Sequence, residues 1–217
     1  MNKLKRGRHD KRMEESGVNK AQLEMIETIR KAEIKESHRW TEYWQDYSHF
    51  FTWQFWVVLA MFVLPLIITI LFIDRKKAFH IGFYGYSVHV FFAYTDVIGT
   101  SNGLWIYPYK IMPYFPSNVT LDASLVPVSY MLLYQYILNN RKNYYLWMIG
   151  LSLGFAYILK PLMVGLGLFH FGEKENFFLL FLGYVTVGLI AKWLTDLFVF
   201  LQKSNILSLR RGEKASK

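Results

Sequence analysis

The chain has 217 residues, of which 53% are hydrophobic and 18% aromatic, and its formal net charge is +9. Several apolar runs after residue 50 approach the length of about 20 residues that a helix needs to cross a bilayer. We therefore expect an integral membrane protein whose positive charge serves cytoplasmic loops and anionic lipid headgroups, and no nucleic-acid partner. The absence of cysteine excludes disulfides, thiol catalysis and Cys-ligated metal centres.

The first 39 residues form a charged N-terminal tail that is expected to be partly helical. Its first 15 residues are typical of a solvated, disordered segment, whereas the stretch from Val18 lacks proline and favours a helix. From Trp40 onward aromatic residues recur at helical spacing, so residues 37–52 are predicted to form an amphipathic helix in the membrane interface. The same aromatic face is alternatively a docking surface for a membrane-protein partner.

Five apolar segments follow, and each is predicted to cross the membrane as a helix. Pro65 is expected to kink the first of them. Residues 40–203 would then form one membrane domain, an all-α bundle of five transmembrane helices, with a basic C-terminal tail at 204–217. The predicted spans are about 53–73, 79–100, 120–138, 144–169 and 177–201.

Basic residues predict the orientation of these spans. Ten of the basic residues lie in the turn between the first and second spans, in the turn between the third and fourth spans, and in the C-terminal tail. Two lie in the loops between the second and third spans and between the fourth and fifth spans. The positive-inside rule therefore places the C-terminus in the cytoplasm. Five spans then put the N-terminal tail outside, although it holds eleven basic residues. Only Lys35 and Arg39 of these lie near the first span, and the rule gives most weight to such residues.

The loop between the second and third spans is rich in proline and tyrosine and faces outward in this topology. Proline stiffens the backbone, and tryptophan and tyrosine suit the membrane–water interface. We therefore expect an ordered outer lid. Its candidate residues are Trp105, Tyr107, Pro108, Tyr109 and Pro113.

Charged side chains inside spans cost on the order of 2.5–3.5 kcal/mol each near the bilayer centre, so they are expected to be paired or to line a polar cavity. Asp96, Asp122 and Lys160 are predicted to lie at similar depths in the membrane, beneath the outer loop. His89 lies on the same helical face as Asp96, one or two helical turns deeper. This outer cluster is either an ion-paired staple between helices or a small site for an ion, a proton or a lipid headgroup. Asp122 is alternatively an N-terminal cap of the third span.

A separate inner pair is predicted in the last span, where Lys192 and Asp196 are four residues apart and can meet on one helical face. The chain contains no nucleophile elbow, HExxH or phosphate-loop motif, and its histidines lack metal-ligand spacing. We therefore predict no catalytic residue, no metal and no cofactor. Gly150 and Gly154 form a small-xxx-small pattern that favours close helix packing within the chain.

Four segments carry a resemblance to a known family. They are FTWQFW (51–56), LWIYPYK (104–110), VPVSYMLLYQY (126–136) and the Lys160-Pro161 step after Phe-Ala-Tyr. With these segments the chain resembles an uncharacterised family of small five-span membrane proteins of spore-forming Gram-positive bacteria. The resemblance implies a multi-pass protein of a bacterial cell membrane. It implies no activity, and Lys160 stands where the family pattern has an acidic residue.

Three functions are compatible with the sequence. The first is a non-enzymatic binding or accessory membrane protein, with the outer loop and the charged cluster as its recognition surface. The second is a small permease or channel component whose path is lined by His89 and the charged residues. The third is an intramembrane lipid-modifying enzyme that uses Asp96 or Asp122 as an acid or base. The lack of a catalytic motif favours the first.

Overall fold

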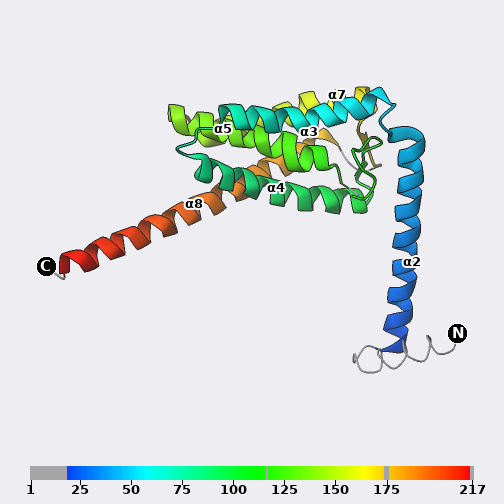
Figure 1. Cartoon of the computed structure of the whole chain (residues 1–217), viewed down its shortest axis with the longest axis horizontal. Helices are drawn as coiled ribbons and strands as arrows, with labels where there is room; N and C mark the ends of the chain where they lie inside the picture. The colour runs from blue at the N-terminus through cyan, green and yellow to red at the C-terminus, as the bar shows by residue number, and fades with distance from the viewer. Residues whose placement is uncertain (1–18, 116, 174–175, 216–217) are drawn as a thin grey trace. The chain divides into compact units, whose positions relative to one another are not determined.

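The computed structural model describes residues 19–115, 117–173 and 176–215, so the predicted disordered segment at 1–15 lies outside it. The chain divides into two compact units, Met1–Tyr43 and Trp44–Lys217. The division falls close to the boundary that composition predicts at residue 39. The described part of the first unit is one helix, and the second unit contains the other described elements (Figure 1).

The helix of the first unit, α2 (Lys20–Tyr43), buries none of its residues. Its apolar side chains, such as Met25 and Ile29, are exposed. Glu27 forms ion pairs with Arg30 and Lys31 at 3.0 and 3.8 Å, which support an exposed helix by a few tenths of a kcal/mol each, roughly. The sequence therefore correctly places a helix after Val18.

The predicted interfacial helix over residues 37–52 is not one helix. The regular α-helix ends at Tyr43 and is followed by the π turn η1 (Trp44–Ser48) and an irregular turn. The Trp44 indole and the Ser48 hydroxyl donate hydrogen bonds to the Lys110 carbonyl oxygen, at 2.9 and 3.2 Å. These long-range bonds compete with continuation of the helix, and periodicity alone does not reveal them.

The second unit is a helical bundle with a small two-stranded sheet. Helix α4 packs against α5 and α8, α6 packs against the same two helices, and α3 packs on the outside against η2 and α5. The elements are α3 (Trp53–Phe72), α4 (Ala78–Ser101), β1 (Trp105–Ile106), η2 (Leu121–Leu125), α5 (Val126–Asn140), α6 (Tyr144–Gly154), η3 (Phe155–Leu159), α7 (Lys160–Gly165), β2 (His170–Phe171) and α8 (Phe177–Ala215).

Three helical segments of the described residues are long and apolar enough to cross a membrane: Trp53–Phe72, Tyr144–Gly165 and Phe177–Ser204. Large apolar side chains are exposed along them, as in α3, where the Ile70 and Leu71 side chains are 72% and 70% exposed. A bilayer would cover such surface. The helices therefore confirm the all-α class and support a membrane location. Helix α5 has only 15 residues and α4 carries many polar side chains, and neither is among these three segments.

Two prolines explain the two π turns inside the bundle. Pro127 and Pro161 each lie two residues after a five-residue π turn, η2 and η3 respectively. Proline lacks the N–H for the preceding turn and its ring clashes with the carbonyl four residues earlier, which favours a wider turn there. Pro65 lies inside α3, and no π turn precedes it, since α3 continues through it as one α-helix.

The Gly150–Gly154 pattern does not serve close packing within the described chain. A Cβ atom built at either glycine meets nothing within 4 Å. Close approach occurs instead at other glycines, including Gly188, where a Cβ would lie 2.9 Å from Met148. The prediction from the small-xxx-small pattern was therefore wrong.

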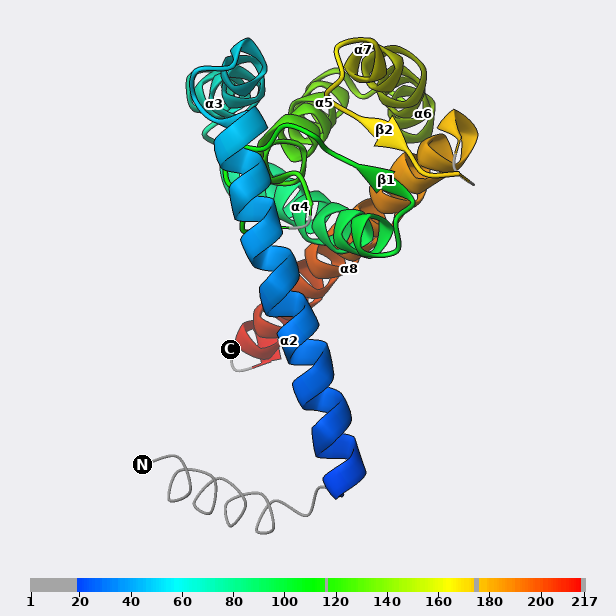
Figure 2. The same ribbon diagram turned by 90° about the vertical axis from the view of Figure 1, so that its right-hand side faces the viewer.

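A short antiparallel sheet joins the outer loop to the segment after α7. Trp105 pairs with Phe171 and Ile106 pairs with His170, and Figure 2 shows β1 and β2 lying across the end of the helices that faces the viewer. Beside the pair, the Gly172 amide donates to the Leu104 carbonyl oxygen at 2.7 Å. The loop is thus held by backbone pairing over one end of the bundle.

Tyrosine hydroxyl groups connect the buried helix faces. The Tyr84 and Tyr144 hydroxyls are 2.8 Å apart, and Tyr144 also donates to the Gly188 carbonyl at 2.8 Å. The Tyr130 hydroxyl donates to the Tyr184 carbonyl at 2.9 Å. A buried hydroxyl needs such partners, so these bonds fix how α4, α5, α6 and α8 face one another.

Candidate functional site: a charged cluster beneath the loop

Asp96, near the C-terminal end of α4, organises the loop above it. Its Oδ1 accepts hydrogen bonds from Trp105 Nε1 at 2.8 Å and from Tyr107 Oη at 2.7 Å. Its Oδ2 accepts from the backbone N–H of Asn118 at 3.1 Å. The Asp96 residue is only 2% exposed. One carboxylate therefore binds the beginning and the end of the loop to α4.

Lys160 approaches the same loop residue from the opposite side. It is 1% exposed at the start of α7, and its Nζ donates to Tyr107 Oη at 3.1 Å. The ammonium group also lies 3.7 Å from the centre of the Phe169 ring, a cation–π distance. Among the described residues, no carboxylate oxygen forms an ion pair with Lys160 within 4.0 Å. Tyr107 therefore connects Lys160 to Asp96 as donor and acceptor at once.

Tyr107 can occupy this central position because its hydroxyl group keeps its proton. Burial, followed by the neighbouring Asp96 and Asp122 carboxyl groups, raises the pKa of Tyr107 well above its ordinary value. The neutral hydroxyl donates to Asp96 and accepts from Lys160. Its ring is fully buried against Phe169, with ring centres 5.3 Å apart.

Asp122 lies on the π turn η2 and is 3% exposed, and its backbone N–H donates to the Asn118 carbonyl oxygen at 3.0 Å. Its Oδ1 has no hydrogen-bond partner in the part of the chain that the structure describes. The capping alternative for Asp122 was wrong, because Asn118 Oδ1 accepts from the Thr120 N–H at 3.0 Å at the start of this helix.

His89 belongs to the same region through the backbone of η2. Its Nδ1 donates to the Asp122 carbonyl oxygen at 2.7 Å, since a carbonyl can only accept. The structure therefore brings all four residues of the predicted outer cluster together, although His89 contacts the Asp122 backbone and not a carboxyl group. The wider turn at η2 presents its backbone to α4.

The remaining residues predicted for the outer loop pack around this centre. Trp105 and Tyr109 lie against the hydrophobic core, and Pro108 and Pro113 are partly buried. Lys110 is 4% exposed, and its Nζ donates to the Phe115 carbonyl at 3.0 Å. The Lys110 carbonyl oxygen also accepts hydrogen bonds from Trp44 and Ser48, so the loop is held by η1 as well as by the cluster.

The inner pair is a separate feature. Lys192 forms an ion pair with Asp196, one helical turn away on α8, and its Nζ lies 5.5 Å from the centre of the Tyr144 ring. The Asp196 side chain is 51% exposed. An ion pair with this exposure contributes at most about 1 kcal/mol. We therefore place the candidate site in the outer cluster.

Sequence reasoning missed several neighbours of the outer cluster. Nothing in the sequence placed Ser117 and Asn118 in the cluster, although Asn118 is 3% exposed and its N–H donates to Asp96. Phe169 and Tyr184 carried no signal, because aromatic residues are common throughout these helices. The donors that reach Asp96 can be identified only when the fold of the loop is known.

The chain was compared with protein-family models, curated proteins and solved structures, and none of them matches. The predicted family resemblance therefore remains a prediction. Function has to be inferred from the geometry of the cluster and of the loop surface.

Close packing between Gly99 and Trp105 gives a test of how the loop is seated. A Cβ atom at Gly99 would lie 2.0 Å from Cζ2 of the Trp105 ring, so Gly99→Ala must displace the indole from Asp96. We expect a loss of about 1–3 kcal/mol in the free energy of unfolding. A red shift of tryptophan fluorescence should accompany the loss.

Gly82→Ala is the matched control, because it lies on the same helix and a Cβ there meets nothing within 4 Å. Helix propensity alone favours alanine over glycine by about 1 kcal/mol. Gly82→Ala should therefore leave the unfolding free energy unchanged or raise it. Equal effects of the two substitutions would show that the Trp105 contact does not hold the loop.

Proposed function

We propose that the chain is a five-span, non-enzymatic accessory protein of the membrane, with its loop end outside and its C-terminus in the cytoplasm. In this proposal the two helices α4 and α5 complete the bundle of spans. The loop end then presents a rigid surface to a membrane-protein partner. The positive-inside distribution of basic residues supports the orientation.

The observation that carries the proposal is the use of the charged groups. Asp96 accepts three hydrogen bonds from loop residues, and Lys160 is enclosed by aromatic rings. Both residues are at most 2% exposed. A catalytic acid or a substrate-binding charge needs access to its substrate. These charges serve instead to hold the loop in one conformation.

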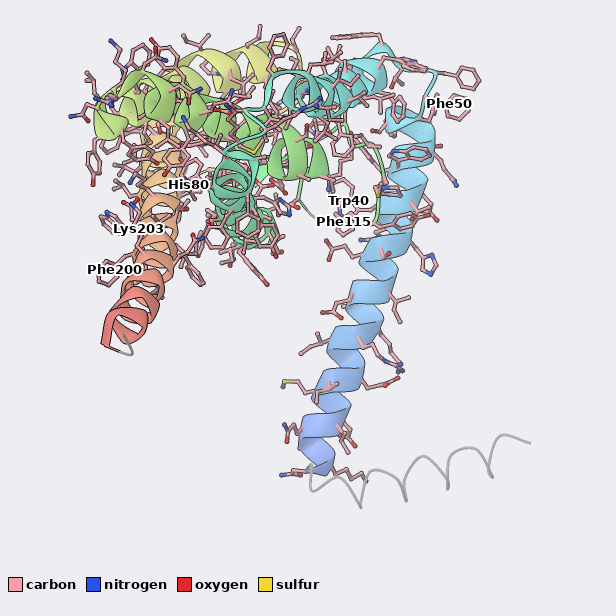
Figure 3. The ribbon with its side chains drawn as sticks, turned by 60° about the vertical axis from the view of Figure 1, so that its left-hand side comes forward. Trp40, Phe50, His80, Phe115, Phe200 and Lys203 are labelled. Atoms are coloured by element: carbon pink, nitrogen blue, oxygen red, sulfur yellow. The ribbon has the colours of Figure 1, made fainter. Side chains whose placement is uncertain are left out.

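The exposed surface of the loop end is aromatic. Tyr114 and Phe51 are 73% and 82% exposed, and Phe50 and Phe115 are also exposed. Figure 3 shows Phe50 projecting at the end of the second unit that carries the loop, with Phe115 at the same end. Rigid aromatic side chains contribute much contact area at low entropic cost, which suits both a headgroup interface and a protein partner.

A small permease remains the second candidate function. It is supported by Asp122 Oδ1 and Tyr184 Oη, two buried polar atoms that find no hydrogen-bond partner among the described residues. An intramembrane enzyme has less support, because Asp96 uses both oxygens for the loop. Ion flux in vesicles that contain the reconstituted protein would favour the permease.

The chain is naturally free of cysteine, which allows a sharp test with single cysteines. Tyr114→Cys lies on the loop surface, and Ser204→Cys lies at the exposed C-terminal part of α8. Each variant is treated in intact cells with a membrane-impermeant maleimide that carries a photoreactive group. We expect labelling of Tyr114→Cys only, and labelling of Ser204→Cys only after permeabilisation.

On illumination, labelled Tyr114→Cys should give a discrete cross-linked product of higher mass. Leu71→Cys is the matched control, because its exposed side chain lies on the predicted lipid-facing surface of α3 and should remain unlabelled. Labelling of Ser204→Cys alone in intact cells would show that the orientation is the reverse of the proposed one. Labelling of Tyr114→Cys without a cross-linked product, combined with ion flux in vesicles, would favour the permease over the accessory function.

A further inference from the structure

The turn between η1 and α3, residues 49–52, carries an apolar surface at the loop end of the second unit. Its Phe50 and Phe51 side chains are 53% and 82% exposed, and their ring centres are 4.5 Å apart. Figure 3 shows Phe50 projecting at this end. Trp53 and Trp56, in the first turn of α3, are also more than half exposed. Residues 49–52 together with these two tryptophans are called the aromatic turn below.

Four hydrogen-bond donors of the aromatic turn are bonded within it. The Thr52 N–H and hydroxyl both donate to the His49 carbonyl oxygen, at 3.0 and 2.8 Å. The Phe51 N–H donates to His49 Nδ1 at 3.1 Å, and the Trp56 indole donates to the Phe50 carbonyl oxygen at 2.9 Å. Internal pairing of this kind suits an apolar solvent, because a polar group without a partner is costly there.

The aromatic turn also carries no charge. Between Asp46 and Asp74 the chain contains no aspartate, glutamate, lysine or arginine. His49 is neutral in this geometry, because its Nδ1 can accept the Phe51 N–H only when that nitrogen carries no proton. The turn therefore avoids the cost of moving a charged group from water towards hydrocarbon.

Lipid fits this surface better than a protein partner does. Protein interfaces carry about one hydrogen bond per 100–200 Å², whereas the Phe50 and Phe51 side chains offer no group that can form one. The surface is continuous along the chain with α3, which buries only Val58 and Pro65 and is long and apolar enough to cross a membrane. The medium that covers α3 therefore extends to the aromatic turn.

The start of α3 limits how deep the turn lies. Thr52 forms no side-chain cap there, so the first N–H groups of the helix need oxygen atoms of water or of lipid headgroups. Tryptophan, present here as Trp53 and Trp56, prefers the same level of the membrane. The aromatic turn therefore fits the boundary between headgroups and acyl chains.

We propose that the aromatic turn is a lipid-binding element that inserts Phe50 and Phe51 among the acyl chains of the leaflet at the loop end. Insertion fixes the depth of η1, whose Trp44 and Ser48 side chains donate to the Lys110 carbonyl oxygen of the loop. The leaflet thereby holds the loop surface at a constant height. This inference rests on the membrane location of the chain and not on the partner proposed for the loop surface.

Depth measurement by electron paramagnetic resonance tests the proposal on the full chain in phosphatidylcholine–phosphatidylglycerol vesicles. A nitroxide label is attached to single cysteines, since the chain contains none of its own. Collisions of the label with oxygen, which concentrates in the bilayer, are compared with collisions with a water-soluble nickel chelate. Spin-labelled lipids calibrate the depth. We expect the label at Phe51→Cys about 5–10 Å below the lipid phosphates.

Two further positions serve as references. Leu64→Cys, at an exposed position in the middle of α3, should give the deepest label. Tyr114→Cys is the matched exposed aromatic position, and its label should lie at or above the phosphates. Phe50→Cys repeats the measurement at a second position of the turn if Phe51→Cys fails to fold.

A label at Phe51→Cys that is as accessible to the nickel chelate as the label at Tyr114→Cys would overturn the proposal. So would a label that neither reagent reaches, because a protein surface, such as a second copy of the chain, would then cover the turn. A shallow label at Leu64→Cys would refute the membrane location itself. The vesicles contain no partner protein, so the result is separate from the cross-linking of Tyr114→Cys.

Discussion

We expect Lys160→Met to be the most destabilising of the substitutions considered for this chain, with a loss of about 3–5 kcal/mol in the free energy of unfolding. Methionine fills a similar volume but removes the positive charge that faces Asp96 through Tyr107. The negative charge of Asp96 is then left buried, at 2% exposure, without the ammonium group that balances it. Unfolding by SDS in lipid–detergent micelles, followed by tryptophan fluorescence, measures the loss.

Lys192→Met is the matched control for this substitution. Lys192 is also a membrane-helix lysine near a tyrosine ring, but its ion-pair partner Asp196 is half exposed. We expect a loss of at most about 1 kcal/mol there. A loss at Lys160 no greater than that at Lys192 would show that the buried ammonium group does not support the fold.

The second large effect is expected for Asp96→Asn. The amide keeps one acceptor oxygen but places an NH₂ group against one of three donors, Trp105, Tyr107 or the Asn118 N–H. Hydrogen bonds to a charged group are worth about 1.5–3 kcal/mol each, so we expect a loss of at least about 3 kcal/mol. The loop should also become accessible, which amide hydrogen exchange over residues 104–118 detects.

Asp196→Asn provides the corresponding control, since it lies on α8 with half of its side chain exposed. It should change the free energy of unfolding by at most about 1 kcal/mol. It should leave amide hydrogen exchange in the loop unchanged. Unchanged loop exchange in Asp96→Asn would mean that the β1–β2 pairing alone holds the loop.

The sequence predicts the helices of this protein well and their irregularities poorly. The expected spans at 53–73 and 79–100 agree within a few residues with α3 and α4, because long apolar runs and charged turns mark their ends. The turn at 141–143 is also found, with Arg141 in the left-handed region at φ 51° and Asn143 as the cap of α6. Local composition determines these features.

The end of α8 shows the limit of composition. A basic tail was predicted at 204–217, but the backbone of α8 continues as a helix to Ala215. Lysine, arginine and glutamate are good helix formers, so a polar segment can extend an apolar helix. A change of polarity predicts the end of a span and not the end of a helix.

The candidate site was predictable in part. Counting helical depth places Asp96, Asp122 and Lys160 beneath one loop. In the structure Tyr107 joins Asp96 to Lys160, and the Asn118 backbone joins Asp96 to the turn that carries Asp122. The direct ion pair expected between Lys160 and a carboxylate is replaced by the bridge through Tyr107. Side-chain directions in an irregular loop depend on long-range pairing such as β1 with β2, which no periodicity encodes.

The central claim is that Asp96 and Lys160, which lie on helices far apart in the sequence, stabilise the loop as one charge-balanced unit. A double-mutant cycle with Asp96→Asn and Lys160→Met tests it most directly, because the double variant contains neither unbalanced charge. We predict that its loss of unfolding free energy falls short of the sum of the single losses by about 1–3 kcal/mol. Additivity within about 0.5 kcal/mol, as expected for the distant pair Asp96→Asn and Lys192→Met, would contradict the account.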